Sequence, residues 1–199
     1  MCYQTKITKK KEELERSFQA RATGMDDFVP GEVFKAFEYP RTPVITKDDP
    51  ELIQLFNWGL VPNWAGTDWN RNYTLNARIE TLDEKRSFKE ITSNRCLVII
   101  NGFYEWQHVN GQKIKYEIGF SDRLFVLGGL YDHSDAGSTY TVVTTEAQGV
   151  MREIHNTKLR MPFAMKNKDS MQAWLEGKSP SPDFDFTTSP DLFRQARLF

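Results

Sequence analysis

Alternation of apolar and polar positions dominates the middle of the chain and predicts β-strands. The runs that predict strands cover residues 42–46, 52–60, 96–100, 103–109, 113–120, 124–131, 140–145 and 161–165. Asn110-Gly111 lies between two of these runs and has the composition of a two-residue β-hairpin turn. The pattern therefore predicts consecutive antiparallel strands through the middle of the chain.

Helical periodicity is weaker and confined to short segments. Leu14 and Phe18, four residues apart, give the charge-rich segment 8–22 a single apolar stripe. Further helices are predicted over residues 84–92, 146–155 and 169–177. Helices do not alternate regularly with the strands, so the sequence predicts an α+β fold built on antiparallel sheet. We expect one domain over residues 1–199, with a loop-like tail from residue 179.

Composition limits the classes of function. The 199 residues are 39% apolar and 13% aromatic, as expected for one globular domain. No apolar run reaches the roughly 20 residues that span a bilayer, and no secretory leader is visible. The only cysteines are Cys2 and Cys96, which points to a reduced, cytoplasmic protein. A net charge of −1 means that any nucleic-acid site must be a local basic cleft.

Cys2 is the first candidate for chemistry. It follows the initiator methionine directly, and a small side chain at this position permits loss of Met1. The chain would then begin with a 1,2-aminothiol, whose amine and thiol both titrate near neutral pH. Such a group traps aldehydes, because the amine forms an imine and the sulfur closes a five-membered thiazolidine ring. The alternative is a cysteine that is simply buried in a first strand.

Three further residues are candidates. Asn76 and Arg78 project from one face of an extended segment. An amide and a phosphate-binding guanidinium could therefore share a cleft. The alternative is an exposed strand edge on which Arg78 forms a salt bridge with Glu80. Glu105 lies in the aromatic run Phe103-Tyr104-Glu105-Trp106, where burial would raise its pKa and suit it to proton transfer. An arginine-paired structural carboxylate is the alternative.

His155 is the histidine most suited to a site. It adjoins Ile154 and precedes Lys158 and Arg160, whereas the other two histidines flank predicted hairpin turns. A purely structural histidine is the alternative. The chain has no metal-ligand spacing, phosphate-binding glycine loop or nucleophile elbow, so we expect no metal and no cofactor.

Aromatic and basic residues are interleaved around residues 58–78. A surface that stacks bases and holds phosphates would suit single-stranded nucleic acid, although some of these aromatics must belong to the core. The residues are Trp58, Trp64, Trp69, Arg71, Tyr73 and Arg78.

Five segments together carry a family resemblance. They are Met1-Cys2, Trp58-Gly59-Leu60-Val61-Pro62 with Trp64, Asn76-Ala77-Arg78 with Glu80-Thr81, Gly102-Phe103-Tyr104-Glu105-Trp106, and His155 with Arg160-Met161-Pro162. In this order they resemble the SRAP family, the SOS response-associated peptidases that are understood as abasic-site processing proteins. The resemblance implies a largely β, barrel-like domain with a cleft over its N-terminus.

The resemblance also implies the roles of the site residues. Cys2 would join covalently to abasic single-stranded DNA after the protein's own peptidase activity removes Met1. Asn76 would place the reacting sugar and amine, and Glu105 would be the acid/base group. His155 would protonate or stabilise the opened sugar and assist reversal of the crosslink.

The DNA contacts follow from the same resemblance. Arg78 and Arg160 would hold phosphates, and Trp58 or Trp64 would line or wedge the strand. Two departures accompany it: Tyr3-Gln4 follows Cys2 where Gly-Arg is common, and five positions separate His155 from Arg160 where two are usual. Nothing in the sequence suggests a partner subunit, so we expect a monomer.

Two other functions remain open from the residues alone. An N-terminal-nucleophile amidohydrolase would use the Cys2 thiolate against an amide. A non-covalent single-strand binding module would use the aromatics and arginines and give salt-dependent, reversible binding.

Overall fold

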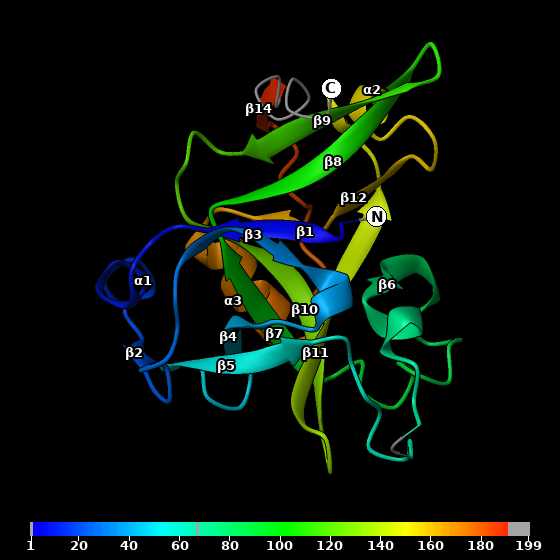
Figure 1. The fold of residues 1–199 in the computed structure, drawn as a ribbon. Coiled ribbons are helices and arrows are strands. Elements are labelled where there is room, and N and C mark those ends of the chain that lie inside the picture. The colour runs from blue at the N-terminus through cyan, green and yellow to red at the C-terminus, as the bar shows by residue number, and fades with distance from the viewer. Residues whose placement is uncertain (1, 67, 191–199) are drawn as a thin grey trace.

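The computed structural model describes residues 2–66 and 68–190, and strands make up most of its regular structure (Figure 1). The strands are β1 (Gln4–Ile7), β2 (Arg21–Ala22), β3 (Gly31–Lys35), β4 (Arg41–Thr46), β5 (Leu52–Trp58), β6 (Asn76–Arg78), β7 (Arg95–Ile100), β8 (Gly102–Val109), β9 (Gln112–Gly119), β10 (Phe125–Ser134), β11 (Gly137–Glu146), β12 (Arg160–Pro162), β13 (Ala164–Met165) and β14 (Thr187–Pro190). The helices are α1 (Lys11–Phe18), α2 (Met151–Ile154) and α3 (Lys168–Leu175), with 3₁₀ turns η1 (Ala36–Glu38), η2 (Arg71–Thr74) and η3 (Ile79–Thr81).

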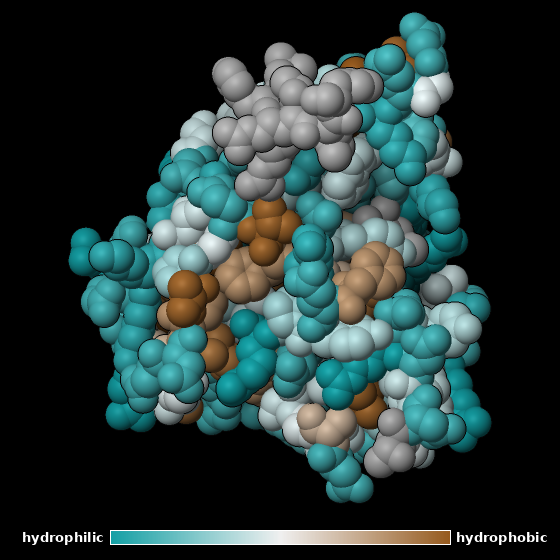
Figure 2. All heavy atoms as spheres, viewed as in Figure 1, coloured by the Kyte–Doolittle hydropathy of each residue, from teal (hydrophilic) through white to brown (hydrophobic). Residues whose placement is uncertain are grey.

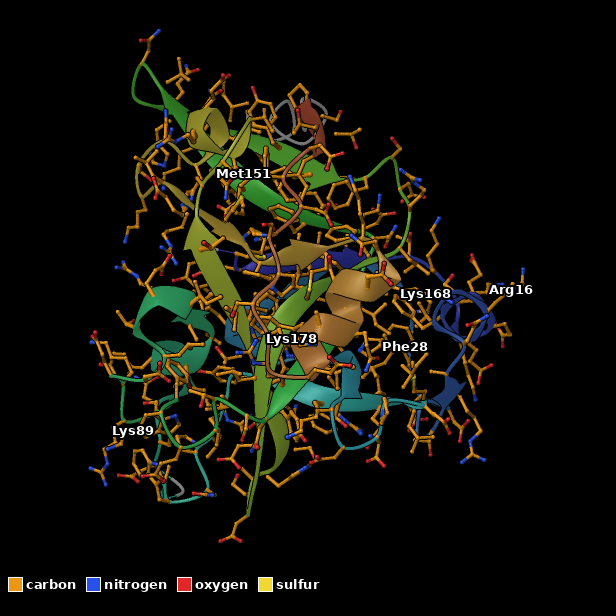
Figure 3. The ribbon with its side chains drawn as sticks, turned by 180° about the vertical axis from the view of Figure 1, so that it is seen from behind. Arg16, Phe28, Lys89, Met151, Lys168 and Lys178 are labelled. Carbon is orange, nitrogen blue, oxygen red and sulfur yellow. The ribbon has the colours of Figure 1, made fainter. Side chains whose placement is uncertain are left out.

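Five strands close into a barrel. Their order is β11-β10-β7-β4-β5, and β5 returns to β11 through a parallel pairing of Trp58 with Tyr140. Every residue of β7 is buried, because one face lines the barrel and α3 covers the other (Figure 3). Closure removes the free edges that an open sheet would expose.

A second sheet has the order β14-β9-β8-β1-β3 and holds the start of the chain. In Figure 1 the β8–β9 hairpin lies above β1 and the barrel strands lie below it. Asn110 and Gly111 both have positive φ, as a two-residue hairpin turn requires, and confirm the predicted hairpin. The predicted α+β fold with a mainly antiparallel, barrel-like sheet is confirmed. In the described part of the chain no helix is long and apolar enough to cross a membrane.

Five predicted elements were wrong in type or extent. The helix expected over 8–22 is limited to α1, and residues 21–22 form β2, which pairs with β5. The segment 84–92 forms successive turns that bury Phe88 and Ile91, because so short a segment gains more from packing than from helical hydrogen bonds. The helix expected over 146–155 shrinks to α2, since β11 extends to Glu146 and Gly149 takes a left-handed conformation.

The other two differences concern strands. The strand expected over 161–165 splits into β12 and β13 at Phe163, whose amide instead donates to the Val143 carbonyl. Within the tail expected to be a loop, residues 187–190 form β14, which extends the second sheet beside β9. In each case a partner strand distant in sequence decides the outcome.

A buried hydrogen bond inside the barrel allows a stability test. The Thr42 and Tyr140 hydroxyls lie 2.6 Å apart and both residues are fully buried. Tyr140→Phe leaves the Thr42 hydroxyl without this partner, so the free energy of unfolding in a denaturant titration should fall by about 1–2 kcal/mol. Tyr39→Phe, which loses an exposed bond to Asn72, is the control and should change it by less than about 0.5 kcal/mol. Equal losses would contradict this account.

Candidate active site

Cys2 lies two residues before the first residue of β1 and is fully buried. Its backbone carbonyl accepts a 2.9 Å hydrogen bond from the Asn76 side-chain amide. Asn76 begins β6, which runs parallel to β11 with Asn76 opposite Val142. The barrel therefore supplies an amide that fixes the position of a residue belonging to the second sheet.

Glu105 lies in the middle of β8 and is 3% exposed. β1 pairs antiparallel with β8, with Thr5 opposite Phe103, and extending this register brings Tyr3 opposite Glu105. Burial raises the pKa of Glu105 to about 7, so both protonation states are populated at neutral pH.

The Cys2 thiol lies in the same buried environment. Burial raises its pKa far above the ordinary range, and the negative charge of Glu105 raises it further. The sulfur lies 3.9 Å from the Gln4 carbonyl oxygen. At neutral pH the thiol is therefore protonated, and it needs a base before it can act as a nucleophile.

His155 follows the last residue of α2 and is 6% exposed. Its Nδ1 lies 2.7 Å from the Arg160 carbonyl oxygen, which can only accept, and 3.3 Å from the Arg160 amide nitrogen, which can only donate. The shorter contact to the carbonyl assigns the hydrogen to Nδ1. Nε2 then presents its lone pair and lies 3.9 Å from Glu105 Oε2. Burial lowers the pKa of His155, so the imidazole is neutral while Glu105 is partly protonated.

The longer spacing between His155 and Arg160 does not remove the histidine from the site. The Leu159 amide donates to the His155 carbonyl at 2.9 Å, and Leu159 has a φ of 50°. The chain thus loops back after α2, and the Arg160 carbonyl returns to the imidazole. Residues 156–159 form an exposed loop, and the imidazole ring of His155 remains buried against the Arg160 carbonyl.

Glu105 and His155 open into a cleft of about 340 Å³. Its lining residues are Tyr3, Glu105, Trp106, His108, Lys113, His155, Thr157 and Lys158. A larger cavity, of about 730 Å³, lies between α1 and α3, the elements that carry Arg16 and Lys168 in Figure 3. Two of the predicted catalytic residues, Glu105 and His155, line the smaller cleft, and none of them lines the larger cavity.

The family model described as "SOS response associated peptidase (SRAP)" matches residues 1–191. The chain belongs to the SRAP family.

Named relatives agree with this assignment. The SRAP chain is 36% identical over 135 residues to the Bacillus subtilis "Abasic site processing protein YoaM", a match that covers 64% of this chain and 58% of that protein. It is 32% identical over 154 residues to the Saccharomyces cerevisiae "Abasic site processing protein YMR114C", covering 73% of this chain and 41% of the yeast protein. The chain thus spans about two fifths to three fifths of these relatives.

Solved structures share the fold. A Bacteroides thetaiotaomicron protein superposes with a TM-score of 0.84 and 28% identity, over 95% of this chain and 91% of that one. A Bordetella bronchiseptica protein gives a TM-score of 0.75 at 19% identity, over 95% and 99% of the two chains. The second likeness is evidence of the common fold alone.

Arg160 has an internal role in this SRAP structure. Its guanidinium forms a bidentate ion pair with Glu80, at 2.8 and 2.9 Å, and also donates to the Thr144 carbonyl at 2.7 Å. Its side chain is only 10% exposed. These contacts connect η3 to the barrel. Arg78, two residues beyond Asn76, is exposed at the end of β6 and can be reached by a phosphate.

The aromatic residues predicted as one surface are divided by the fold. Trp58 is fully buried, stacks on Tyr140 and donates to the Leu75 carbonyl, so it packs the core. Trp64 is 38% exposed, with Trp69 against its edge and Arg86 4.2 Å over its ring.

The guanidinium of Arg71 lies over a different ring, 5.4 Å from the centre of Tyr39. Tyr73 is 78% exposed. Sequence reasoning missed the cleft residues Tyr3, Lys113 and Thr157. The position of Tyr3 beside Cys2 and that of Thr157 close to His155 were signals that could have found two of them.

The raised pKa of Glu105 predicts a pH-dependent stability. The native carboxyl binds its proton more tightly than the unfolded one, so the free energy of unfolding falls as pH rises from about 4.5 to about 7. Glu105→Gln should remove the decrease in the free energy of unfolding that Glu105 causes, which is on the order of 3 kcal/mol. His155 contributes a pH dependence of opposite sign, and this contribution is present in both proteins. Denaturant titrations at pH 5 and pH 8 measure the difference.

Glu153→Gln, which changes an exposed carboxyl on α2, is the control and should keep the wild-type pH dependence. A wild-type pH dependence in Glu105→Gln would show that the carboxyl is not the buried titrating group.

Proposed function

We propose that this SRAP chain captures abasic sites in single-stranded DNA covalently, through a thiazolidine formed by Cys2 after autocatalytic removal of Met1. The observation that carries the proposal is that Glu105 and His155 line one cleft beside the buried Cys2. The Cys2 carbonyl accepts from Asn76, and its thiol is close enough to Glu105 for that charge to raise its pKa. The relatives of this chain are named abasic site processing proteins. The names of both relatives describe the processing of abasic sites.

Maturation comes first in this proposal. Hydrolysis of the Met1–Cys2 peptide bond consumes one water, releases methionine and leaves the α-amine of Cys2. Glu105 supports this step, because a carboxylate with a pKa near 7 can take a proton from the attacking group and return it to the departing amine.

Capture then proceeds through the aldehyde of the ring-opened abasic sugar. The Cys2 amine adds to the aldehyde carbon, and loss of one water gives an imine. The thiol adds to the imine carbon, forming the C–S bond, while its proton passes to the nitrogen. The sum is one aldehyde and one aminothiol giving one thiazolidine and one water. The protonated thiol favours attack by the amine first, with the sulfur closing the ring afterwards.

The neighbouring side chains divide the proton transfers. Glu105 accepts the thiol proton and delivers protons to the departing water. The neutral imidazole of His155, with Nε2 toward Glu105, exchanges a proton with the sugar oxygen and assists the reverse reaction. Asn76 keeps Cys2 in position through its amide. Its Oδ1 is buried without a hydrogen-bond partner among the described residues, and this oxygen suits the N–H of a freed amine.

The DNA strand is proposed to follow the exposed basic and aromatic residues around this cleft. Arg78 suits a phosphate, and Arg71 and Trp64 lie on exposed segments. Lys113 and Lys158 line the cleft and add positive charge close to the reacting sugar. Arg160 and Trp58 contribute through the interior, by supporting the segment that carries Asn76 and Arg78.

Cys2→Ala tests the covalent function. The variant should give no adduct that survives a denaturing gel after incubation with abasic single-stranded DNA, whereas wild-type protein gives one and its intact mass lacks Met1. Cys96→Ala, which changes the other buried cysteine inside the barrel, is the matched control and should still crosslink. Crosslinking by Cys2→Ala at the wild-type level, or active protein that retains Met1, would refute the thiazolidine. Salt-sensitive binding without an adduct would favour a non-covalent module.

Glu105 and His155 should affect different phases of the reaction. Glu105→Gln keeps the shape of the side chain but does not titrate, so crosslink formation should slow by about 10²-fold or more. His155→Ala should still form the adduct but transfer far more slowly to excess competitor abasic DNA. Time courses of formation and of transfer measure both effects. Crosslink formation at the wild-type rate by Glu105→Gln would contradict the role proposed for Glu105. Transfer at the wild-type rate by His155→Ala would contradict the role proposed for His155.

A further inference from the structure

An exposed aromatic side chain lies next to the reactive residue. Phe37, in η1, is 55% exposed, although burying a side chain of this size commonly stabilises a protein. Its ring centre lies 5.0 Å from that of Tyr3, with 35° between the planes. Tyr3 follows Cys2 and lines the cleft that holds Glu105 and His155. The ring pair therefore runs from the cleft to the surface.

The backbone holds this pair in place. The Ala36 amide donates to the Tyr3 carbonyl at 2.9 Å, so η1 is attached to the first residues of the chain. β1 and β3 are paired on the same side, with Gln4 opposite Lys35. An exposed ring on a fixed segment loses little freedom when it binds a flat ligand.

The surroundings of the pair suit a nucleic-acid strand. Tyr39, at the end of η1, has the Arg71 guanidinium over its ring, and its hydroxyl donates to Asn72 at 2.8 Å. Aromatic faces beside an arginine are the usual elements of single-strand binding sites, where bases stack and phosphates pair with positive charge. The face shown in Figure 2 is mainly hydrophilic, with separate apolar patches.

We propose that Tyr3 and Phe37 form a stacking shelf for the nucleobase adjacent to the abasic sugar. This inference rests on the proposed function. An abasic sugar leaves the neighbouring base without a stacking partner on one side, and the exposed ring of Phe37 supplies that partner while the sugar reaches Cys2. The shelf makes capture depend on an intact base beside the lesion, and it accepts any of the four bases, because each has a π-face.

The test uses single-stranded DNA that carries a tetrahydrofuran abasic analogue, which has no aldehyde and cannot crosslink. Fluorescence anisotropy gives the dissociation constant for an oligonucleotide with intact neighbours and for two others in which the 5′ or the 3′ neighbouring base is also removed. Wild-type protein should bind one of the two doubly abasic strands about tenfold more weakly. Phe37→Ala should bind the intact-neighbour strand about tenfold more weakly than wild type and lose nothing further when that base is removed.

Three variants complete the test. Phe37→Trp and Tyr3→Phe keep a ring pair and should keep the dependence on the neighbouring base. Phe184→Ala removes another half-exposed phenylalanine, outside the cleft lining, and should bind like wild type. Melting temperatures verify that each variant folds.

The inference is overturned if wild type and Phe37→Ala lose the same factor on removal of the neighbouring base, or if Phe37→Ala binds the intact-neighbour strand like wild type. Neither result touches the proposed function, which is judged separately with aldehyde-bearing DNA. If wild-type protein forms no adduct there, the covalent mechanism fails whatever the anisotropy shows.

Discussion

Two backbone pairings, Thr5 with Phe103 and Lys6 with Gly102, hold the start of the chain against the strand that carries Glu105. The hydrogen bond from Asn76 to the Cys2 carbonyl adds a second restraint from the barrel. A chain terminus normally moves freely. Here strand pairing on one side and a side-chain amide on the other keep Cys2 in a buried position close to Glu105.

Burial then determines the protonation of the whole site. The same exclusion of water raises the pKa values of the Cys2 thiol and the Glu105 carboxyl and lowers that of the His155 imidazole. Each group is thereby biased toward its neutral form near pH 7. A site of neutral acids and bases can pass protons in either direction with small changes in energy, which suits the reversible covalent capture proposed for Cys2.

The two sheets contribute differently to this arrangement. The second sheet carries Tyr3 and Glu105, while the barrel positions β6 and, through β12, the loop that returns to His155. The ion pair of Arg160 with Glu80 fastens these barrel-side segments together. Arg160, which the sequence suggests for phosphate binding, is thus held in an internal ion pair, whereas Arg78 is exposed.

The sequence by itself determined the strand content, the hairpin at Asn110-Gly111 and the family, because these depend on local alternation, turn residues and ordered motifs. It also marked Cys2, Glu105 and His155 as chemically unusual. Only the tertiary structure decided that Trp58 packs the core, that Arg160 pairs with Glu80 and that Tyr3, which lines the cleft, packs against Phe37. These outcomes depend on pairings between segments far apart in the chain, such as β5 with β11, and no local pattern records which distant segment a side chain will meet.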